Sequence, residues 1–463
     1  MQGRALVPYR SGWLKRQVHS GRKQAYPVIC FFDGPSLSCF ANSIFMTNKL
    51  LSSLLAFFLL FFMSGVEASA KKNNAKFISI NGTSLIGTDG KPYYIVGTNL
   101  GNWLNPEGYM FDFKKTNCEW MINNMVCEMV GPDDARAFWK AFKDNYITED
   151  DIAFISRTGA NTVRLPFNYK LFTSEDYMGE NNPQEGFRVM DEVVGWCKKY
   201  GLHVILDMHD CPGGQTGDNI DNGYGYPWLF VSESSQKLFT DIWVSIARHF
   251  AGEPTVLGYE LMNEPIATTF TKEVQEELNK KLEPLYKKVV AAIRTVDNNH
   301  IILLGGSQWN SNFEPFSDWK FDDKIMYTCH RYGGPATKEA IGSFIAFRDT
   351  TGLPMYMGEI GHNTDEWQED FVKVMRDANI NYTFWPYKKV TSSCMVGIQK
   401  PEGWDSIVVK FSEADRCSFD SIRKARPDQA LAKRLLMQFA ENAKFKNCKP
   451  QTSYIKSMGL KTN

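Results

Sequence analysis

The sequence carries no excess of charge of either sign, no apolar run long enough to cross a membrane and no closely spaced cysteine pair. Its 52 basic and 52 acidic residues give a formal net charge of +0, so nothing electrostatic points to nucleic acid or an anionic membrane surface as a partner. The longest apolar run, residues 50–63, is shorter than the ~20 residues of a spanning helix. The cysteines form no Cys-x-x-Cys pair, which argues against a zinc knuckle or a thioredoxin-like site.

Histidine is also scarce, with 7 in 463 residues. Those that follow residue 70 form neither a His-x-His pair nor a His-Glu-x-x-His motif. A metal-dependent hydrolase on a barrel fold would need ligands at such spacings. We therefore expect no metal site.

The apolar run has the form of an export signal. It follows Lys49 and is followed by Ala68-Ser69-Ala70, and a basic start, a short apolar core and an Ala-x-Ala end are typical of a cleaved signal. We expect residues 46–70 to be this signal and residues 1–45 to be an upstream extension. The protein would then be secreted or periplasmic. The alternative is an uncleaved signal anchor that tethers the protein to the membrane.

After the signal, β-rich runs alternate with amphipathic helical patterns. The strand candidates are 93–100, 162–167, 204–209, 257–262, 301–305, 325–330, 355–359 and 382–387. The helix candidates are 151–157, 187–199, 235–250, 272–296, 338–347, 366–378 and 429–443. Strand–helix alternation predicts an α/β fold with a parallel sheet, and eight repeats predict a closed (β/α)8 TIM barrel. An open doubly wound sheet is the competing fold, but the turn after the first strand lacks the Gly-rich dinucleotide spacing.

The remaining segments complete the domain. Residues 77–86 predict a small N-terminal β-hairpin, and without any internal repeat or linker we expect residues 71–463 to form one catalytic domain. Three long segments without a regular pattern, 105–144, 210–230 and 388–423, each follow a strand. They should form extended loops on the C-terminal face of the barrel, where active sites are built.

Polar side chains stand at the ends of consecutive predicted strands. They are Asn99, Asn102 and Trp103 after the first strand, Arg164 in the second, His209 and Asp210 at the end of the third, Asn263 and Glu264 after the fourth, His330 and Tyr332 at the sixth, Glu359 at the seventh and Trp385 in the eighth. Each alone is explained as a buried group with a polar partner. Together they predict an active site, because a barrel needs no such ring of polar groups to fold.

Two of these residues, Glu264 and Glu359, suit the cleavage of a glycosidic bond. One carboxyl must be protonated to assist the leaving oxygen, and the other must be ionised to attack the anomeric carbon. Arg164 is the candidate for keeping the nucleophile ionised, with a hydrogen bond from Tyr332 to the same carboxylate. We expect Asn263 to hold a sugar 2-hydroxyl and Trp385 to form the floor under the reacting ring.

The motifs around these residues resemble those of glycoside hydrolase family 5, the cellulase-like group of retaining enzymes. The matching segments are Arg164 in a Val-Arg-Leu-Pro strand, Asp207-Met208-His209, Asn263-Glu264-Pro265, His330-Arg331-Tyr332, Gly358-Glu359 and Trp385. The resemblance covers nearly all of residues 71–463 and implies Glu264 as acid/base and Glu359 as nucleophile. It also implies a subsite lined by Arg164, His209, Asn263, His330, Tyr332 and Trp385, and no metal or organic cofactor.

The substrate is indicated by a finer resemblance. Gly101-Asn102-Trp103-Leu104 and residues 209–219 are similar to the exo-β-1,3-glucanase branch of the family, which implies Asn102 and Trp103 as further substrate-binding residues. The sequence differs from that branch at Asn102, where the branch has glycine. We expect a β-glucan partner, no nucleic acid, no stable membrane insertion and a monomer. An endo-β-1,4-glucanase, another β-glycosidase of the family and a non-catalytic carbohydrate-binding protein stay open as alternatives.

Overall fold

The computed structural model describes residues 76–221, 223–390 and 392–462. The expected signal and the upstream extension before it lie outside the described residues. Within these ranges, no helix combines the length and the apolar character needed to cross a membrane.

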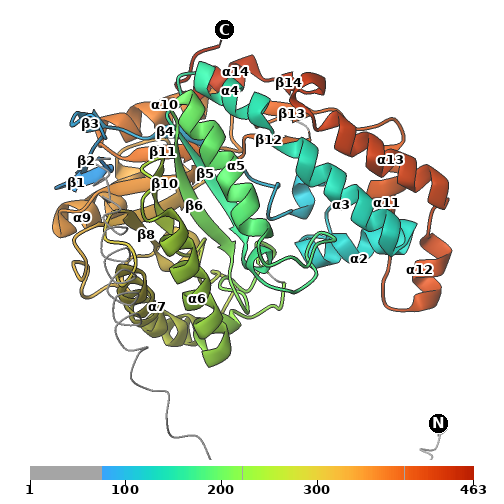
Figure 1. The fold of residues 1–463 in the computed structure, drawn as a ribbon, viewed down its shortest axis with the longest axis horizontal. Helices are drawn as coiled ribbons and strands as arrows, with labels where there is room; N and C mark the ends of the chain where they lie inside the picture. The colour runs from blue at the N-terminus through green and yellow to red at the C-terminus, as the bar shows by residue number, and fades with distance from the viewer. Residues whose placement is uncertain (1–75, 222, 391, 463) are drawn as a thin grey trace, which may run out of the picture. The chain divides into compact units, whose positions relative to one another are not determined.

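Eight parallel strands close into a barrel, which confirms the predicted (β/α)8 fold (Figure 1). They are β4 (Val96–Asn99), β5 (Thr162–Asn168), β6 (His203–Asp210), β7 (Val256–Glu260), β8 (Ile301–Gly305), β9 (Ile325–Arg331), β10 (Met355–Ile360) and β11 (Asn381–Phe384). Neighbours in the chain are neighbours in the barrel, and β11 pairs with β4 to close it. Every residue of β8 is buried, because a parallel sheet of this kind is covered on both faces.

Helices connect the strands and cover the outside of the barrel (Figure 1). They are α4 (Glu149–Arg157), α5 (Glu185–Tyr200), α6 (Glu233–Phe250), α7 (Lys272–Arg294), α9 (Gly342–Thr351) and α10 (Asp365–Asp377). Short turns lie between them: η2 (Tyr169–Phe172), η3 (Trp228–Phe230), η4 (Glu339–Ile341) and α8 (Ser307–Asn310), in which Gln308 and Trp309 are left-handed. Helix α6 shows why they form where they do. The Ser232 hydroxyl accepts a hydrogen bond from the Ser235 backbone N–H and so caps the first turn. Phe239, Trp243 and Ile246 then recur at helical spacing and are fully buried.

The predicted N-terminal hairpin is present and carries a third strand. β1 (Ser79–Asn81), β2 (Ser84–Ile86) and β3 (Pro92–Tyr93) form an antiparallel sheet. Leu85 from this sheet and Ile78 just before it share one buried cluster with Ile205, Leu257 and Ile301, which lie near the starts of barrel strands. The hairpin therefore closes the end of the barrel opposite the strand ends that carry the polar residues.

The expectation of an irregular loop over residues 105–144 is wrong. After the short turn η1 (Gly108–Phe111), this segment contains α2 (Glu119–Val130) and the start of α3 (Pro132–Tyr146). Pro132 begins α3 at a position where its missing N–H costs nothing. Trp139 and Phe142 on α3 are fully buried, and α3 packs against α13 (Gln429–Asn442), almost 300 residues later in the chain. This distant partner made the helix hard to recognise from local pattern.

Residues 388–423 are also more regular than expected. They contain β12 (Lys388–Val390), β13 (Val396–Ile398), the π-helical turn η5 (Asp405–Val409), α11 (Lys410–Ser412) and most of α12 (Phe419–Ala425), and η6 (Phe445–Asn447), β14 (Lys449–Pro450) and α14 (Thr452–Ser457) follow α13. Helices α2, α3, α11, α12 and α13 lie together beside the barrel (Figure 1). Of the three expected loops, only 210–230 remains largely without regular structure, and it lies over the C-terminal ends of the strands.

Candidate active site

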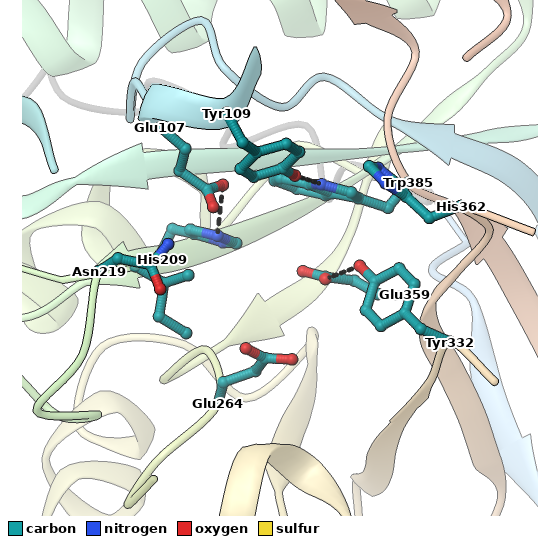
Figure 2. A pocket seen from close by; sticks show the side chains of 10 residues that line it. Glu107, Tyr109, His209, Asn219, Glu264, Tyr332, Glu359, His362 and Trp385 are labelled. Carbon is teal, nitrogen blue, oxygen red and sulfur yellow. Dashed lines mark hydrogen bonds and ion pairs between the residues drawn. The ribbon is translucent and has the colours of Figure 1, made fainter. Parts of the chain in front are cut away.

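A cavity of about 270 Å³ opens at the C-terminal ends of the barrel strands (Figure 2). The residues that line it come from the ends of β6 and β10 and from the segments after β4, β6, β7, β9, β10 and β11: Glu107, Tyr109, His209, Asn219, Ile220, Glu264, Tyr332, Glu359, His362 and Trp385. This is the face on which barrel enzymes build their active sites. Both glutamates singled out from the sequence project into it.

The strands bring the two glutamates face to face. Glu359 lies in β10, next to an irregularity in its pairing with β9, and Glu264 follows β7 with a left-handed backbone, φ 43°. Such a φ is uncommon for a residue with a side chain and gathers at functional sites. One carboxylate oxygen of Glu264 lies within 4.8 Å of one of Glu359.

Glu359 faces a buried cation and a hydroxyl donor. The Arg164 Nη1 lies 2.7 Å from its Oε1, and the Tyr332 hydroxyl donates a hydrogen bond to its Oε2. Arg164 is fully buried, and Glu260 holds the guanidinium through two hydrogen bonds of 2.8 Å. Asn99 accepts a further bond from Nη1. A cation and a hydroxyl that both point at one carboxylate favour its charged form.

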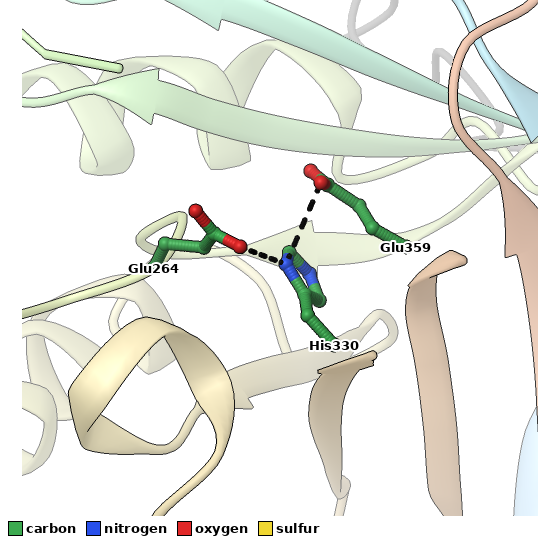
Figure 3. Close-up of side chains that lie close together, drawn as sticks. All are labelled: Glu264, His330 and Glu359. Atoms are coloured by element: carbon green, nitrogen blue, oxygen red, sulfur yellow. Dashed lines mark hydrogen bonds and ion pairs between the residues drawn. The ribbon is translucent and has the colours of Figure 1, made fainter. Parts of the chain in front are cut away.

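Glu264 has the environment of a protonated acid. Burial raises the pKa of its carboxyl to about 7, and the positive charge of Arg164 only partly opposes this. Its Oε1 lies 2.7 Å from His330 Nδ1 (Figure 3). The same Nδ1 lies 3.6 Å from Glu359 Oε2. The two glutamates thus differ in the form that their surroundings favour.

A chain of hydrogen bonds fixes the residues beneath the cavity. Arg164 Nη2 donates to Asn263 Oδ1 at 2.8 Å, which turns the Asn263 amide nitrogen toward His209 Nε2, 3.3 Å away. His209 therefore carries its proton on Nδ1, which lies 2.7 Å from Asp207. Burial lowers the pKa of His209 to about 4, so the ring is neutral near pH 7. It stacks on Trp385 with the ring planes 1° apart.

The structure places most of the residues expected from the sequence at this site. Of those beyond the two glutamates, His209, Tyr332 and Trp385 line the cavity. Arg164, Asn263 and His330 lie beneath it and bond to the lining residues.

Asn102 and Trp103 lie outside the cavity lining, and their expected contact with substrate stays a prediction. The backbone at Asn102 is left-handed, φ 64°, and turns both side chains into the protein. Asn102 Oδ1 accepts a hydrogen bond from the Glu107 backbone N–H, and Trp103 Nε1 donates to the Lys143 carbonyl at 2.8 Å. Asn102 therefore shapes the loop that carries Glu107 and does not line the cavity itself.

Sequence reasoning missed Glu107, Tyr109 and His362. Glu107 is 3% exposed, and its Oε1 has no hydrogen-bond partner among the described residues. Burial and the nearby glutamates raise its pKa well above the ordinary value. The Tyr109 hydroxyl accepts a hydrogen bond from Trp385 Nε1 at 2.5 Å. An acidic residue soon after the first strand was the available signal, because that position faces the same end of the barrel.

Glu264, His330 and Glu359 also lie close enough to share a metal ion. Their ligand atoms are already engaged, since His330 Nδ1 bonds to Glu264. The Arg164 guanidinium lies 2.7 Å from the Glu359 carboxylate, and its positive charge would repel a divalent cation there. The trio fits acid–base chemistry better than metal binding.

The sequence is similar to those of known glycoside hydrolases. The family model for cellulase (glycosyl hydrolase family 5) matches residues 114–390. The chain is 29% identical to a beta-xylosidase of Phanerodontia chrysosporium over 364 residues, which cover 70% of this chain and 73% of that protein. It is 28% identical to Endoglucanase C of Acetivibrio thermocellus over 317 residues, covering 55% and 88%. It is 30% identical to a glucan 1,3-beta-glucosidase of Kluyveromyces lactis over 259 residues, covering 52% and 56%.

Solved structures show the same fold. An endogalactoceramidase aligns with a TM-score of 0.51 at 18% identity, over 68% of this chain and 75% of that chain. A hyperthermostable endocellulase aligns with a TM-score of 0.50 at 19% identity, over 78% and 99%. At these identities the likeness is one of fold alone, whereas the family model covers more than half of the sequence. The chain belongs to glycoside hydrolase family 5 and is a glycoside hydrolase.

Proposed function

We propose that this protein is a retaining exo-acting β-glucanase that favours β-1,3 linkages, with Glu264 as acid/base and Glu359 as nucleophile. The observation that carries the proposal is the contrast between the two glutamates. One carboxyl is kept protonated by burial, with a pKa of about 7, and the other faces Arg164 and Tyr332. Environments that separate two carboxyl groups in this way assign the acid and the nucleophile.

The spacing of the glutamates supports retention of configuration. Retaining enzymes hold their carboxyl groups about 5–5.5 Å apart, and inverting enzymes hold them about 6.5–9.5 Å apart to admit a water. Oxygens of Glu264 and Glu359 lie within 4.8 Å of each other. This leaves room for a sugar carbon to be attacked directly, but not for a water between the sugar and the base.

The reaction then proceeds in two displacements. Glu359 attacks the anomeric carbon while Glu264 gives its proton to the leaving oxygen, so the glycosidic bond breaks and an ester to Glu359 forms. Glu264, now a carboxylate, takes a proton from water as that water attacks the same carbon. The ester breaks, and both glutamates return to their starting states. Asn263 beneath the site holds the sugar 2-hydroxyl, and Trp385 forms the floor of the subsite.

The shape of the cavity supports action at chain ends. A volume of about 270 Å³ lies just below the ~300–1,000 Å³ typical of sites for drug-sized ligands. Glu107 and Tyr109 bound the cavity from the segment after β4, and Asn219 and Ile220 bound it from the 210–230 loop (Figure 2). The Oε1 of Glu107 lies 3.9 Å from His209 Nε2 and has no hydrogen-bond partner among the described residues, so it can bond to a sugar hydroxyl. Such a pocket suits a terminal sugar better than a polymer that passes through.

The relatives support a β-glucan as the substrate and suggest one other candidate substrate. A glucan 1,3-beta-glucosidase and an endoglucanase are both similar to this chain. The beta-xylosidase matches 70% of it, which favours β-xylosides as the second candidate substrate.

Product analysis tests the proposal. The purified protein is incubated with β-1,3-, β-1,4- and mixed-linkage glucans and with xylan, and mannan serves as the control. We expect glucose from the ends of β-1,3-glucan. Internal cuts would contradict exo action, and release of xylose alone would favour the second candidate. No product from any polymer would point to a non-catalytic carbohydrate-binding protein.

We further propose that residues 46–70 direct export and are removed after Ala70. The support is the pattern of a basic start, a short apolar core and an Ala-x-Ala end. N-terminal sequencing of secreted protein should begin at Lys71. A mature N-terminus upstream of Met46 would contradict cleavage and favour the signal anchor.

A further inference from the structure

We propose that Asn310 is a positioning residue that, through His330, places the catalytic proton on the Oε2 of Glu264. This deepens the function proposed above and rests on it, because it takes Glu264 as the acid. The proton must sit on the oxygen that can reach the leaving group. Asn310 touches neither the cavity nor the carboxyl groups and acts only on the His330 ring.

The three side chains form a relay from the protein interior to the acid. The Asn310 amide nitrogen lies 3.1 Å from His330 Nε2. On the other side of the ring, Nδ1 lies 2.7 Å from Glu264 Oε1. Burial lowers the pKa of His330 to about 4, so near pH 7 the ring is neutral and carries a single proton. Which nitrogen holds that proton decides what Glu264 can do.

Two features place the proton of His330 on Nδ1. First, Nδ1 faces both Glu264 and Glu359, at 2.7 and 3.6 Å, and these oxygens stabilise a proton between them. Second, the Asn310 amide presents its nitrogen to Nε2. In this orientation an amide N–H donates to an unprotonated Nε2, whereas the reverse orientation would present Oδ1 and require the ring proton on Nε2, away from the two carboxyl groups. Buried donors are rarely left unpaired.

The proton on Nδ1 settles where the acid carries its own. His330 donates to Glu264 Oε1, so a second proton on Oε1 would point at the first. Protonated Glu264 therefore holds its proton on Oε2, the oxygen that does not contact His330 (Figure 3). After the proton has left, the same N–H stabilises the carboxylate that remains.

The turn that presents Asn310 is strained. Gln308, Trp309 and Asn310 have φ of 50°, 57° and 59°, and three successive left-handed residues with side chains are unusual. A Cβ at Gly305 would lie 2.1 Å from Asn310 Oδ1, so this side chain fits only against glycine. Strain of this kind persists where the surrounding structure enforces it, often at functional sites. Asn310 is fully buried.

Several other groups surround Glu264 and stay unchanged when Asn310 is substituted. Apart from His330 itself, those that are charged or titratable are Glu107 and Tyr109 after β4, Arg164 on β5, His209 on β6, Asp218 in the loop after β6, Tyr332 after β9 and Glu359 on β10. A change in the pH profile of an Asn310 variant therefore reports on the state of His330 and its bond to Glu264.

Asn310→Asp tests the relay with almost no change in shape. An aspartate can only accept, so it draws the His330 proton to Nε2 or protonates the ring. In the first case the unprotonated Nδ1 accepts the acid proton of Glu264. In the second case the positive charge of the ring lowers the pKa of Glu264. We expect kcat/KM on β-glucan to fall about tenfold or more, since general acid catalysis contributes about 10²–10⁴. The dinitrophenolate of a dinitrophenyl β-glucoside leaves with little help from a general acid, so kcat/KM for this substrate should fall by less than about threefold. The alkaline limb of the β-glucan profile should shift, to higher pH where Nδ1 accepts the proton of Glu264 and to lower pH where the ring is charged, and an unchanged limb would count against the relay.

Two further variants guard against a purely structural effect. Asn312→Asp makes the same change in the same turn, where Asn312 bonds to Gln308 and not to His330, and it should leave both rates unchanged. Asn310→Gly tolerates the left-handed backbone and removes the whole side chain, the amide included. It should show the same split between substrates even if Asn310→Asp does not fold. Equal losses on both substrates in the Asn310 variants would overturn the proposal.

¹⁵N NMR shows which ring nitrogen of His330 carries the proton, and this measurement does not depend on catalytic activity. In the ¹⁵N-histidine spectrum of the wild-type protein, the His330 signals, assigned by their absence in His330→Gln, should show a proton on Nδ1 and none on Nε2. In Asn310→Asp the proton should appear on Nε2. A wild-type ring protonated on Nε2 would overturn the proposal. A wild-type protein that cleaves no glycoside, yet shows the Nδ1 proton, would refute the proposed function and leave the relay standing.

Discussion

Glu264 is expected to lower the stability of the folded protein at alkaline pH, because its surroundings favour the protonated acid. Burial raises its pKa from 4.5 to about 7. A carboxyl with a raised folded pKa contributes stability that is fully present below its unfolded pKa and is lost as pH rises through its folded pKa. The loss therefore runs from about pH 4.5 to about pH 7. Glu264→Gln keeps the shape and neutrality of the protonated acid and escapes this loss.

The size of the effect follows from the pKa of Glu264. The difference between 4.5 and about 7 corresponds to about 3 kcal/mol, at about 1.4 kcal/mol per pKa unit. The side chain is 13% exposed, so solvent screening reduces this only slightly. An unfolding entropy of about 2 cal/mol/K per residue gives about 0.8 kcal/mol/K for a domain of about 390 residues. Glu264→Gln should therefore unfold about 4 °C above wild type at pH 8, and at the same temperature at pH 4.

Calorimetry at both pH values measures this difference. Glu277→Gln on α7 is the matched control, because that side chain is 64% exposed and its ion pair with Lys281 is of the exposed i,i+4 kind, worth about 0.3–0.5 kcal/mol, so its effect on Tm should differ by less than about 1 °C between the two pH values. Glu264→Gln should also lose most of its turnover on β-glucan. A Tm at pH 8 equal to or below that of wild type would show that burial of Glu264 does not favour the protonated form, and would refute its assignment as the acid.

Three further substitutions probe the groups around the nucleophile. Tyr332→Phe removes the hydroxyl that donates to Glu359, a charge-assisted bond of about 1.5–3 kcal/mol, so kcat should fall roughly ten- to hundredfold; an unchanged kcat would contradict this contact. Arg164→Met leaves buried carboxylates unpaired at a cost of about 3–5 kcal/mol, and calorimetry should show a Tm about 4–6 °C lower; a Tm equal to wild type would refute this. Gly101→Ala would bring a methyl group within 2.6 Å of the Trp385 ring, so the ring must shift and steady-state kinetics should show a higher KM; an unchanged KM would remove Trp385 from the subsite.

Much of the barrel could be predicted because its strands are buried on both faces. Such strands read as short apolar runs, and β8 begins and ends at the residues expected from the sequence. The residues at their ends converge for the same reason, since parallel strands all point to one face. Helices α2 and α3 could not be recognised in the same way. The buried face of α3, with Trp139 and Phe142, finds its partner in α13, far along the chain.

The site residues that were missed depend on backbone turns that no residue pattern announces. Glu107 reaches the cavity because the chain turns at Asn102, whose φ is 64° and whose side chain binds the Glu107 N–H. Asn310 reaches His330 through three left-handed residues packed against Gly305. In both cases tertiary contacts override the local preference of the chain. By contrast, Arg164 was recognisable because a cation within an apolar strand requires buried partners.

The most direct test of the two-carboxylate account is the stereochemistry of the first product. Proton NMR can follow the anomeric signals during the first minutes of hydrolysis of a short β-1,3-glucan, before the free sugar equilibrates. With Glu264 and Glu359 oxygens within 4.8 Å, the β-anomer should appear first and the α-anomer only later. If the α-anomer appears first, the reaction inverts configuration, and Glu359 is not the nucleophile.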